Sequence, residues 1–131
     1  MSHFSKIQTR IHDITILKKT LGSLGFTEIT NIKQLKDSKG DIYNVDLLVH
    51  PHINQVIIEP IGFLWDGVKY NIITDLEHWP NQGTFNFFLE KLNQEYSLNV
   101  ILNKTLKNGF QKIEQNILKD GSIKVIVQKW N

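Results

Sequence analysis

Two Asp-Gly dipeptides, each flanked by alternating apolar residues, constrain the fold of this 131-residue chain more than any other feature. In "VIIEPIGFLWDGVKYNIITDL", a two-residue loop at Asp66-Gly67 aligns apolar residues along one face of a hairpin. The predicted pairs are Trp65 with Val68, Phe63 with Tyr70, and Ile61 with Ile72. A shift of one residue would place Phe63 opposite Lys69, so the alternation favours this register. Asp-Gly also suits the type I′ turn that a two-residue loop needs.

The last stretch, "FQKIEQNILKDGSIKVIVQKWN", predicts a second hairpin around a three-residue loop, Lys119-Asp120-Gly121. Gly121 would supply the left-handed residue of a bulged turn. The predicted pairs are Ile117 with Ile123, Gln115 with Val125, Ile113 with Val127, and Phe110 with Trp130. We therefore expect the last strand to be paired to its end, and the apolar faces of both hairpins to be buried beneath helices.

Helical spacing is clear in two stretches of the chain. "HDITILKKTLGSLGF" repeats apolar residues every three or four positions, with Asp13 as the N-cap and Gly25 as the C-terminal stop. "FNFFLEKLNQEY" carries a second apolar stripe. Asn99 and Asn103 then occupy positions where that stripe would need apolar residues. We therefore predict a break near Ser97, followed by a further helix.

The remaining apolar runs are strands. Alternation from Ser5 to Ile11 predicts the first, and alternation over Tyr43, Val45, Leu47 and Val49 predicts one continuous strand. The expected order is β-α-β-β-β-β-α-α-β-β. This order predicts one α+β domain over residues 1–131, with a mostly antiparallel sheet and helices packed on it.

Composition excludes several classes of function. The chain has no cysteine, which excludes disulfides, thiolate nucleophiles and cysteine-based metal sites. No apolar run reaches the roughly 18–20 residues of a membrane span, so we expect no membrane association. Gly-rich nucleotide motifs are missing from the sequence, and no cofactor is expected. Arg10 is the only arginine and alanine is absent, a bias typical of A/T-rich genomes.

Three segments carry a family resemblance: "MSHFSKIQT", "FLWDGVKYNIITDL" and "DGSIKVIVQKWN". Together they resemble the hypothetical chloroplast reading frame thirty-five (ycf thirty-five) family of algal plastid genomes and cyanobacteria. The resemblance covers nearly the whole chain. It implies a plastid-encoded protein of the plastid stroma, in agreement with the A/T-rich bias. It implies no reaction and no site residues, since the family has no settled function.

The nearest pattern to a metal site is His50-Pro51-His52. In an extended chain these two imidazoles point the same way and could share an ion, although a site needs further ligands. The alternative is a pair of surface histidines around a proline that ends a strand.

Acid–base chemistry has its best candidates in "TDLEHWP", where Asp75 and His78 lie at the exit of a strand. His3, with Asp46 or Asp75, is a second candidate for a proton relay. The alternative for Asp75 and His78 is that they are turn residues, with Trp79 packing on the following helix. The alternative for His3 is that it is a histidine at the end of a strand.

A binding function has other candidates. Phe110 and Trp130 would form an aromatic patch on the last hairpin, which favours a protein partner. The lysines are scattered among acids and the net charge is +2, so the sequence does not favour a nucleic acid partner. We expect a non-catalytic binding or accessory factor for assembly or regulation. The alternatives are an enzyme that uses His and Asp residues, and a weak RNA-binding protein.

Overall fold

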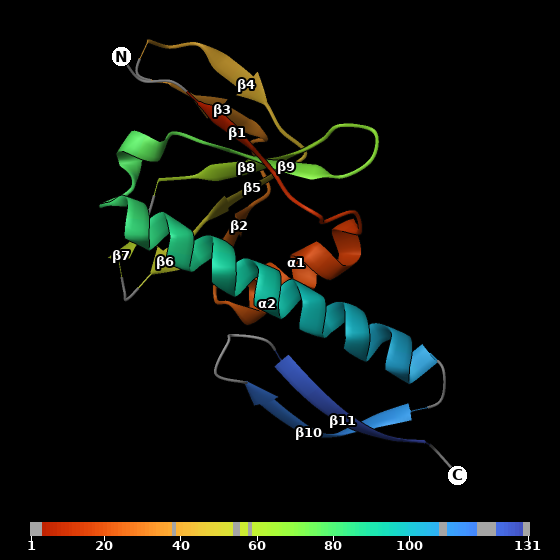
Figure 1. The fold of residues 1–131 in the computed structure, drawn as a ribbon. Coiled ribbons are helices and arrows are strands. Elements are labelled where there is room, and N and C mark those ends of the chain that lie inside the picture. The colour runs from red at the N-terminus through yellow and green to blue at the C-terminus, as the bar shows by residue number, and fades with distance from the viewer. Residues whose placement is uncertain are drawn as a thin grey trace.

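The computed structural model describes residues 4–37, 39–53, 56–57, 59–107, 110–117 and 123–129. Its centre is a five-stranded antiparallel sheet with strand order β1-β9-β8-β5-β2. In that order the strands are Ser5–Gln8, Tyr70–Thr74, Ile61–Trp65, Leu47–His50 and Thr27–Ile29. Helices α1 (Ile14–Ser23) and α2 (Gln82–Lys107) lie along one face of the sheet (Figure 1). The predicted α+β class with a mostly antiparallel sheet is confirmed.

Each face of the sheet contributes to its own apolar cluster, because side chains alternate along every strand. Phe63 and Ile72 point toward the helices and are fully buried with Phe88 and Leu92 of α2. The opposite face is covered by the small hairpin of β3 (Gln34–Lys36) and β4 (Ile42–Asn44). Its cluster consists of Leu35, Val45, Leu48 and Ile73.

Gly62 is required where the β3–β4 segment meets the sheet. A Cβ atom at this position would lie 2.4 Å from Cγ1 of Val45, closer than real side chains approach. The prediction of one continuous strand from Tyr43 to Val49 is wrong. This segment is divided at Val45 and Asp46 into β4, which covers one face, and β5, which belongs to the sheet.

Helix α1 begins and ends at the residues that the sequence predicts. Oδ1 of Asp13 accepts hydrogen bonds from the main-chain N–H groups of Thr15 (2.9 Å) and Ile16 (3.1 Å). At the other end Gly25 has a φ of 78° and donates its N–H to the carbonyl of Gly22. Phe26 donates to the carbonyl of Leu21, which completes a Schellman motif.

The β8–β9 hairpin shows that the predicted two-residue loop is wrong. Trp65 pairs with Tyr70 and Phe63 with Ile72, so the loop contains four residues, 66–69. This register differs from the predicted one by two positions, and a shift of two leaves the same residues on each face. The carboxylate of Asp66 determines the longer loop, because its Oδ1 accepts from the N–H groups of Val68 and Lys69 at 2.9 Å.

Helix α2 is one continuous helix of 26 residues, so the predicted break near Ser97 is wrong. Asn99 faces the core and donates from Nδ2 to Oγ1 of Thr20 on α1 at 3.0 Å. A hydrogen-bonded asparagine thus occupies a core position where the periodicity required an apolar residue. Leu98 is also buried, although it belongs to neither main cluster. The two C-terminal strands, Phe110–Ile117 and Ile123–Lys129, contact the same helix.

The C-terminal hairpin consists of β10 (Phe110–Ile117) and β11 (Ile123–Lys129), which lie along α2 on the side away from the sheet (Figure 1). The predicted pairs Ile117 with Ile123 and Gln115 with Val125 are confirmed. The pairing of Ile113 with Val127 is wrong, because the register shifts between Lys112 and Glu114. Phe110 consequently pairs with Lys129 and not with Trp130. Trp130 and the loop 118–122 lie outside the described residues.

The observed element order contains more short strands and one helix fewer than predicted. The described residues form eleven strands where seven were predicted, and the additional strands include β6 (His52–Ile53) and β7 (Val56–Ile57). The single-turn helix η1 (Leu76–His78) was not predicted either. Among the described residues, no helix is long and apolar enough to cross a membrane.

Candidate functional site

An elongated groove of about 830 Å³ lies between the end of β1 and helix α2. One wall is β1 and its connection to α1, and the other is the middle of α2; Lys69 from the β8–β9 loop also contributes. The lining residues are Gln8, Thr9, Arg10, Ile11, His12, Lys69, Leu89, Asn93, Tyr96, Ser97, Val100 and Ile101. The volume lies within the range of roughly 300–1,000 Å³ that is typical of ligand pockets.

The first wall is held in place by hydrogen bonds around Thr9. Its hydroxyl donates to the carbonyl of Tyr70 and accepts from the N–H of Ile11 at 3.0 Å. The N–H of Tyr70 donates to the carbonyl of Ile11 at 2.7 Å. Thr9 and Ile11 are therefore buried, whereas Arg10 between them is exposed at the groove.

Tyr96 connects the two walls. Its hydroxyl accepts from the main-chain N–H groups of His12 (3.3 Å) and Asp13 (3.2 Å), and Nδ1 of His12 lies 3.3 Å from the same oxygen. The ring itself is buried in the main apolar cluster. One phenol thus fixes the distance between the connection before α1 and the middle of α2.

The charges of the groove are of one sign. Arg10 is exposed and Lys69 is half-buried, and neither forms an ion pair with another described residue. Lys104 is exposed one helical turn beyond Val100 on α2. No acidic side chain is found among the described residues that line the groove. An anionic group would therefore find cations here without a competing carboxylate.

The carboxylates of Asp13 and Asp66, near the groove, form other interactions. The Asp13 carboxylate caps α1. The Asp66 carboxylate is turned toward its own loop: hydrogen bonds from the N–H groups of Lys69 and Val68 and from the Asn71 side chain lower its pKa to about 2. Burial raises the pKa of Tyr70, and the charges of Asp46 and Asp13 raise it further.

Two of the candidates for acid–base chemistry are close together. Nε2 of His78 lies 3.6 Å from Oδ2 of Asp75. Asp75 is buried, and its Oδ1 accepts from the N–H of Glu77 at 3.0 Å at the start of η1. Trp79 is buried against Phe85 and Phe88 of the following helix, and its Nε1 donates to Oγ1 of Thr74 at 3.0 Å.

Asp46, a further candidate for acid–base chemistry, is held at a different place. Oδ2 of Asp46 accepts from the main-chain N–H of Trp65 at 2.7 Å, beside the β8–β9 loop. His3 lies outside the described residues. The role of these side chains in acid–base chemistry stays a prediction. The carboxylates of Asp46 and Asp75 each accept a hydrogen bond from a main-chain N–H group.

His50 and His52 lie at the junction of β5 and β6, with His50 opposite Thr27 in the sheet. Nε2 of His52 is 3.5 Å from Oγ1 of Thr27. Within the part of the chain that the structure describes, no three His, Cys, Asp or Glu side chains are grouped so that they could hold a metal ion. Phe110 lies in β10, and the aromatic patch that it was predicted to form with Trp130 includes residues outside the described part of the chain.

Sequence reasoning missed the groove, because its walls come from segments 84 positions apart, as the contact between His12 and Tyr96 illustrates. The one available signal was Arg10, the only arginine in a chain that otherwise uses lysine. Arginine is favoured where a carboxylate or phosphate is bound in a fixed geometry.

Comparison with known proteins identifies relatives for the whole chain. A family described as "Protein of unknown function (DUF1257)" matches residues 20–126. The chain is 41% identical to uncharacterized protein ycf35 of Pyropia yezoensis, over 100% of this chain and 99% of the relative. It is 35% identical to ycf35 of Cyanophora paradoxa over 99% of this chain and 98% of the relative.

A further relative, ycf35 of Guillardia theta, is 34% identical over 99% of this chain and 98% of the relative. These findings confirm the resemblance inferred from the sequence, and the relatives support a plastid origin. No solved structure matches the chain at a significant level.

Proposed function

We propose that this chain, which belongs to the DUF1257 family, is a non-catalytic accessory factor that binds another protein in the plastid stroma. The ycf35 members of the family have no known function. The binding site in this proposal is the groove between the β1–α1 connection and α2. A role in assembly or regulation suits such a protein, since it would act by occupying a surface of its partner.

The observation that carries the proposal is the charge of the groove. Arg10 is exposed and Lys69 is half-buried beside the apolar residues of the lining, and neither has an ionic partner among the described residues. The remaining lining is mostly apolar or neutral, which suits a protein surface better than a phosphate backbone. An RNA-binding groove would combine several cations with stacked aromatic rings, and here the one lining aromatic, Tyr96, is buried.

The rival proposal is an enzyme centred on Asp75 and His78. Their separation of 3.6 Å favours it, but Asp75 is 3% exposed and its Oδ1 caps η1. A substrate would therefore reach the imidazole and not the carboxylate. The pair supports catalysis less well than the groove supports binding.

Affinity capture from algal plastid stroma tests the proposal. The immobilised full-length chain is compared with the double variant Arg10→Gln/Lys69→Gln. A matched control, Lys18→Gln/Lys19→Gln, removes two charges from exposed positions of α1 that do not line the groove. We expect a specific protein to be retained by the wild type and the control and to be lost with the groove variant. Retention by all three proteins, or by none, would contradict the proposal.

A further inference from the structure

We infer that the partner inserts an extended segment with alternating acidic and apolar side chains into the groove, where one end of the segment reaches the edge of β1 at Gln8. This inference rests on the proposed function and specifies the chemistry of the occupant. Three properties of the groove support it: its length, its charge distribution and its position at the edge of the sheet.

The groove extends along α2. Its α2 wall runs from Leu89 to Ile101, and the twelve steps between these two residues, with a rise of about 1.5 Å each, extend over about 18 Å. An extended segment advances by about 3.3 Å per residue, so five or six residues would span this wall. A compact small molecule would occupy only part of such a length.

The charged and apolar residues of the groove are separated in a way that suits alternating side chains. Arg10 and Lys69 lie on the wall formed by the sheet and its connections. Leu89, Val100 and Ile101 lie on the helical wall, and Ile101 is 42% exposed. In an extended segment successive side chains point to opposite sides, so every second residue would face the cations and the others would face the helix.

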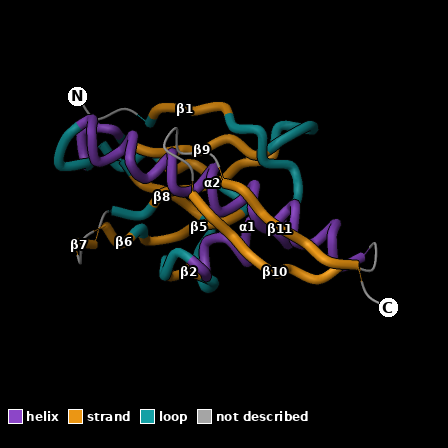
Figure 2. The backbone as a smooth tube through the Cα atoms, turned by 60° about the horizontal axis from the view of Figure 1, so that its bottom comes forward, coloured by secondary structure: helices purple, strands orange, loops and turns teal. Residues whose placement is uncertain are grey.

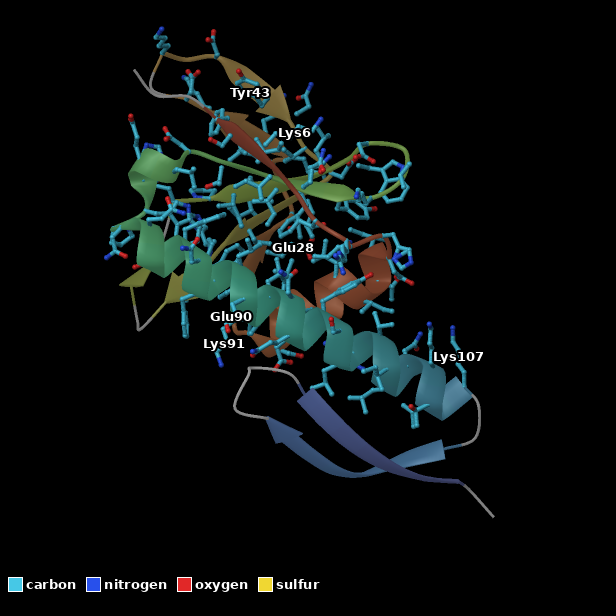
Figure 3. All side chains as sticks on the ribbon, in the orientation of Figure 1. Lys6, Glu28, Tyr43, Glu90, Lys91 and Lys107 are labelled. Atoms are coloured by element: carbon cyan, nitrogen blue, oxygen red, sulfur yellow. The ribbon has the colours of Figure 1, made fainter. Side chains whose placement is uncertain are left out.

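Neither Glu90 nor Glu95, the two acidic residues of α2, lines the groove. Glu90 and Lys91 project from α2 on the side away from the sheet, and Lys107 lies at its end (Figure 3). Lys104 and Lys107 are both exposed in the last turns of the helix, where basic side chains also interact favourably with the helix dipole. Both lysines lie beyond the Ile101 end of the groove wall.

The edge of β1 can supply main-chain hydrogen bonds. Within the described residues β1 pairs only with β9, so it is the outermost strand of the sheet (Figure 2). The groove begins at Gln8, the last residue of β1. A segment in the groove is therefore placed to continue as an added strand, which is a common way in which proteins bind extended peptides.

Fluorescence anisotropy with the full-length chain tests the inference. The probe is a labelled six-residue peptide of alternating Glu and Val, and the reference is the same peptide with Lys in place of Glu. We expect the Glu peptide to bind at least about tenfold more tightly than the Lys peptide, which corresponds to about 1.4 kcal/mol. Arg10→Gln/Lys69→Gln should weaken its binding by about tenfold, and Lys18→Gln/Lys19→Gln by less than about twofold.

Two further comparisons separate the contributions of the groove. Ile101→Ser should weaken binding several-fold, whereas Leu106→Ser should not, because both residues are exposed apolar positions of α2 but only Ile101 lines the groove. Methylation of alternate amide nitrogens in the peptide should also weaken binding, since it removes the donors that pair with β1.

Several results would overturn the inference. Equal binding of the two peptides, or equal loss in the groove variant and the control, would exclude an acidic segment. Tighter binding of decanoate or of a single-stranded oligonucleotide, with the same dependence on Arg10 and Lys69, would assign the groove to a small amphipathic anion or to nucleic acid. If stromal capture succeeds while the peptide fails, the segment is wrong and the proposed function stands. If capture fails, the proposed function itself is wrong.

Discussion

Removal of one hydroxyl at Tyr96 should measurably destabilise the protein, although the ring stays in place. In the wild type this oxygen accepts from the N–H groups of His12 at 3.3 Å and Asp13 at 3.2 Å. Tyr96→Phe preserves the buried ring and leaves both donors without this partner. A hydrogen bond contributes about 0.5–1.5 kcal/mol, and both distances are long, so we expect a total loss of about 1–2 kcal/mol.

Urea unfolding at neutral pH, followed by circular dichroism, measures this loss directly. The midpoint should fall while the slope of the free energy against urea stays unchanged, because the surface exposed on unfolding is the same. Thermal unfolding should show a decrease in Tm of roughly 3–8 °C for a chain of this size.

Tyr43→Phe provides the matched control for Tyr96→Phe. Tyr43 is 46% exposed, and its hydroxyl forms no hydrogen bond with another described residue. Its variant should change the free energy of unfolding by less than about 0.5 kcal/mol. Equal losses in both variants, or no loss in Tyr96→Phe, would refute the assignment of Tyr96 as the connection between the two walls of the groove.

Three further predictions concern the fold. Asp66 should titrate with a pKa of about 2 in a carbon-detected NMR experiment, and an observed pKa near 3.8 would contradict the loop geometry. The stabilising effect of its carboxylate should therefore be complete above the pKa of the unfolded chain, near 3.8, and should be lost as the pH falls through 2. Gly62→Ala should lower the free energy of unfolding by about 1–3 kcal/mol, because the added Cβ would meet Val45 at 2.4 Å. Gly22→Ala, in open space on α1, should be neutral or stabilising, and chemical denaturation of the two variants distinguishes these outcomes. Asn99→Ala should cost about 1 kcal/mol or more in the same assay through the lost hydrogen bond to α1, and a value near zero would refute its place in the core.

The sequence predicted those elements whose ends depend on local chemistry. Asp13 and Gly25 set the limits of α1 through hydrogen bonds within a few residues of themselves, and both were correctly assigned. The strands of both hairpins were also found, because alternation of apolar residues is a local signal.

Features that depend on distant partners were not predictable in this way. The loop of the β8–β9 hairpin was misjudged for a different, local reason: shifts by two residues preserve the apolar face, so alternation cannot choose between them, whereas the hydrogen bonds of Asp66 favour the longer loop. The break at Ser97 was inferred from the polarity of Asn99, whose partner Thr20 lies 79 positions away. The groove escaped notice for the same reason, since Arg10 and Tyr96 meet only in the folded chain.

The most direct test of the account is a map of where the segment binds. Amide chemical shifts of the isotopically labelled full-length chain would be recorded while the Glu/Val peptide is added. The account predicts that the largest changes fall on residues 8–12, on Lys69, and on the α2 wall from Leu89 to Ile101. Changes centred on the β3–β4 hairpin or around Asp75 and His78, with the groove unaffected, would contradict it.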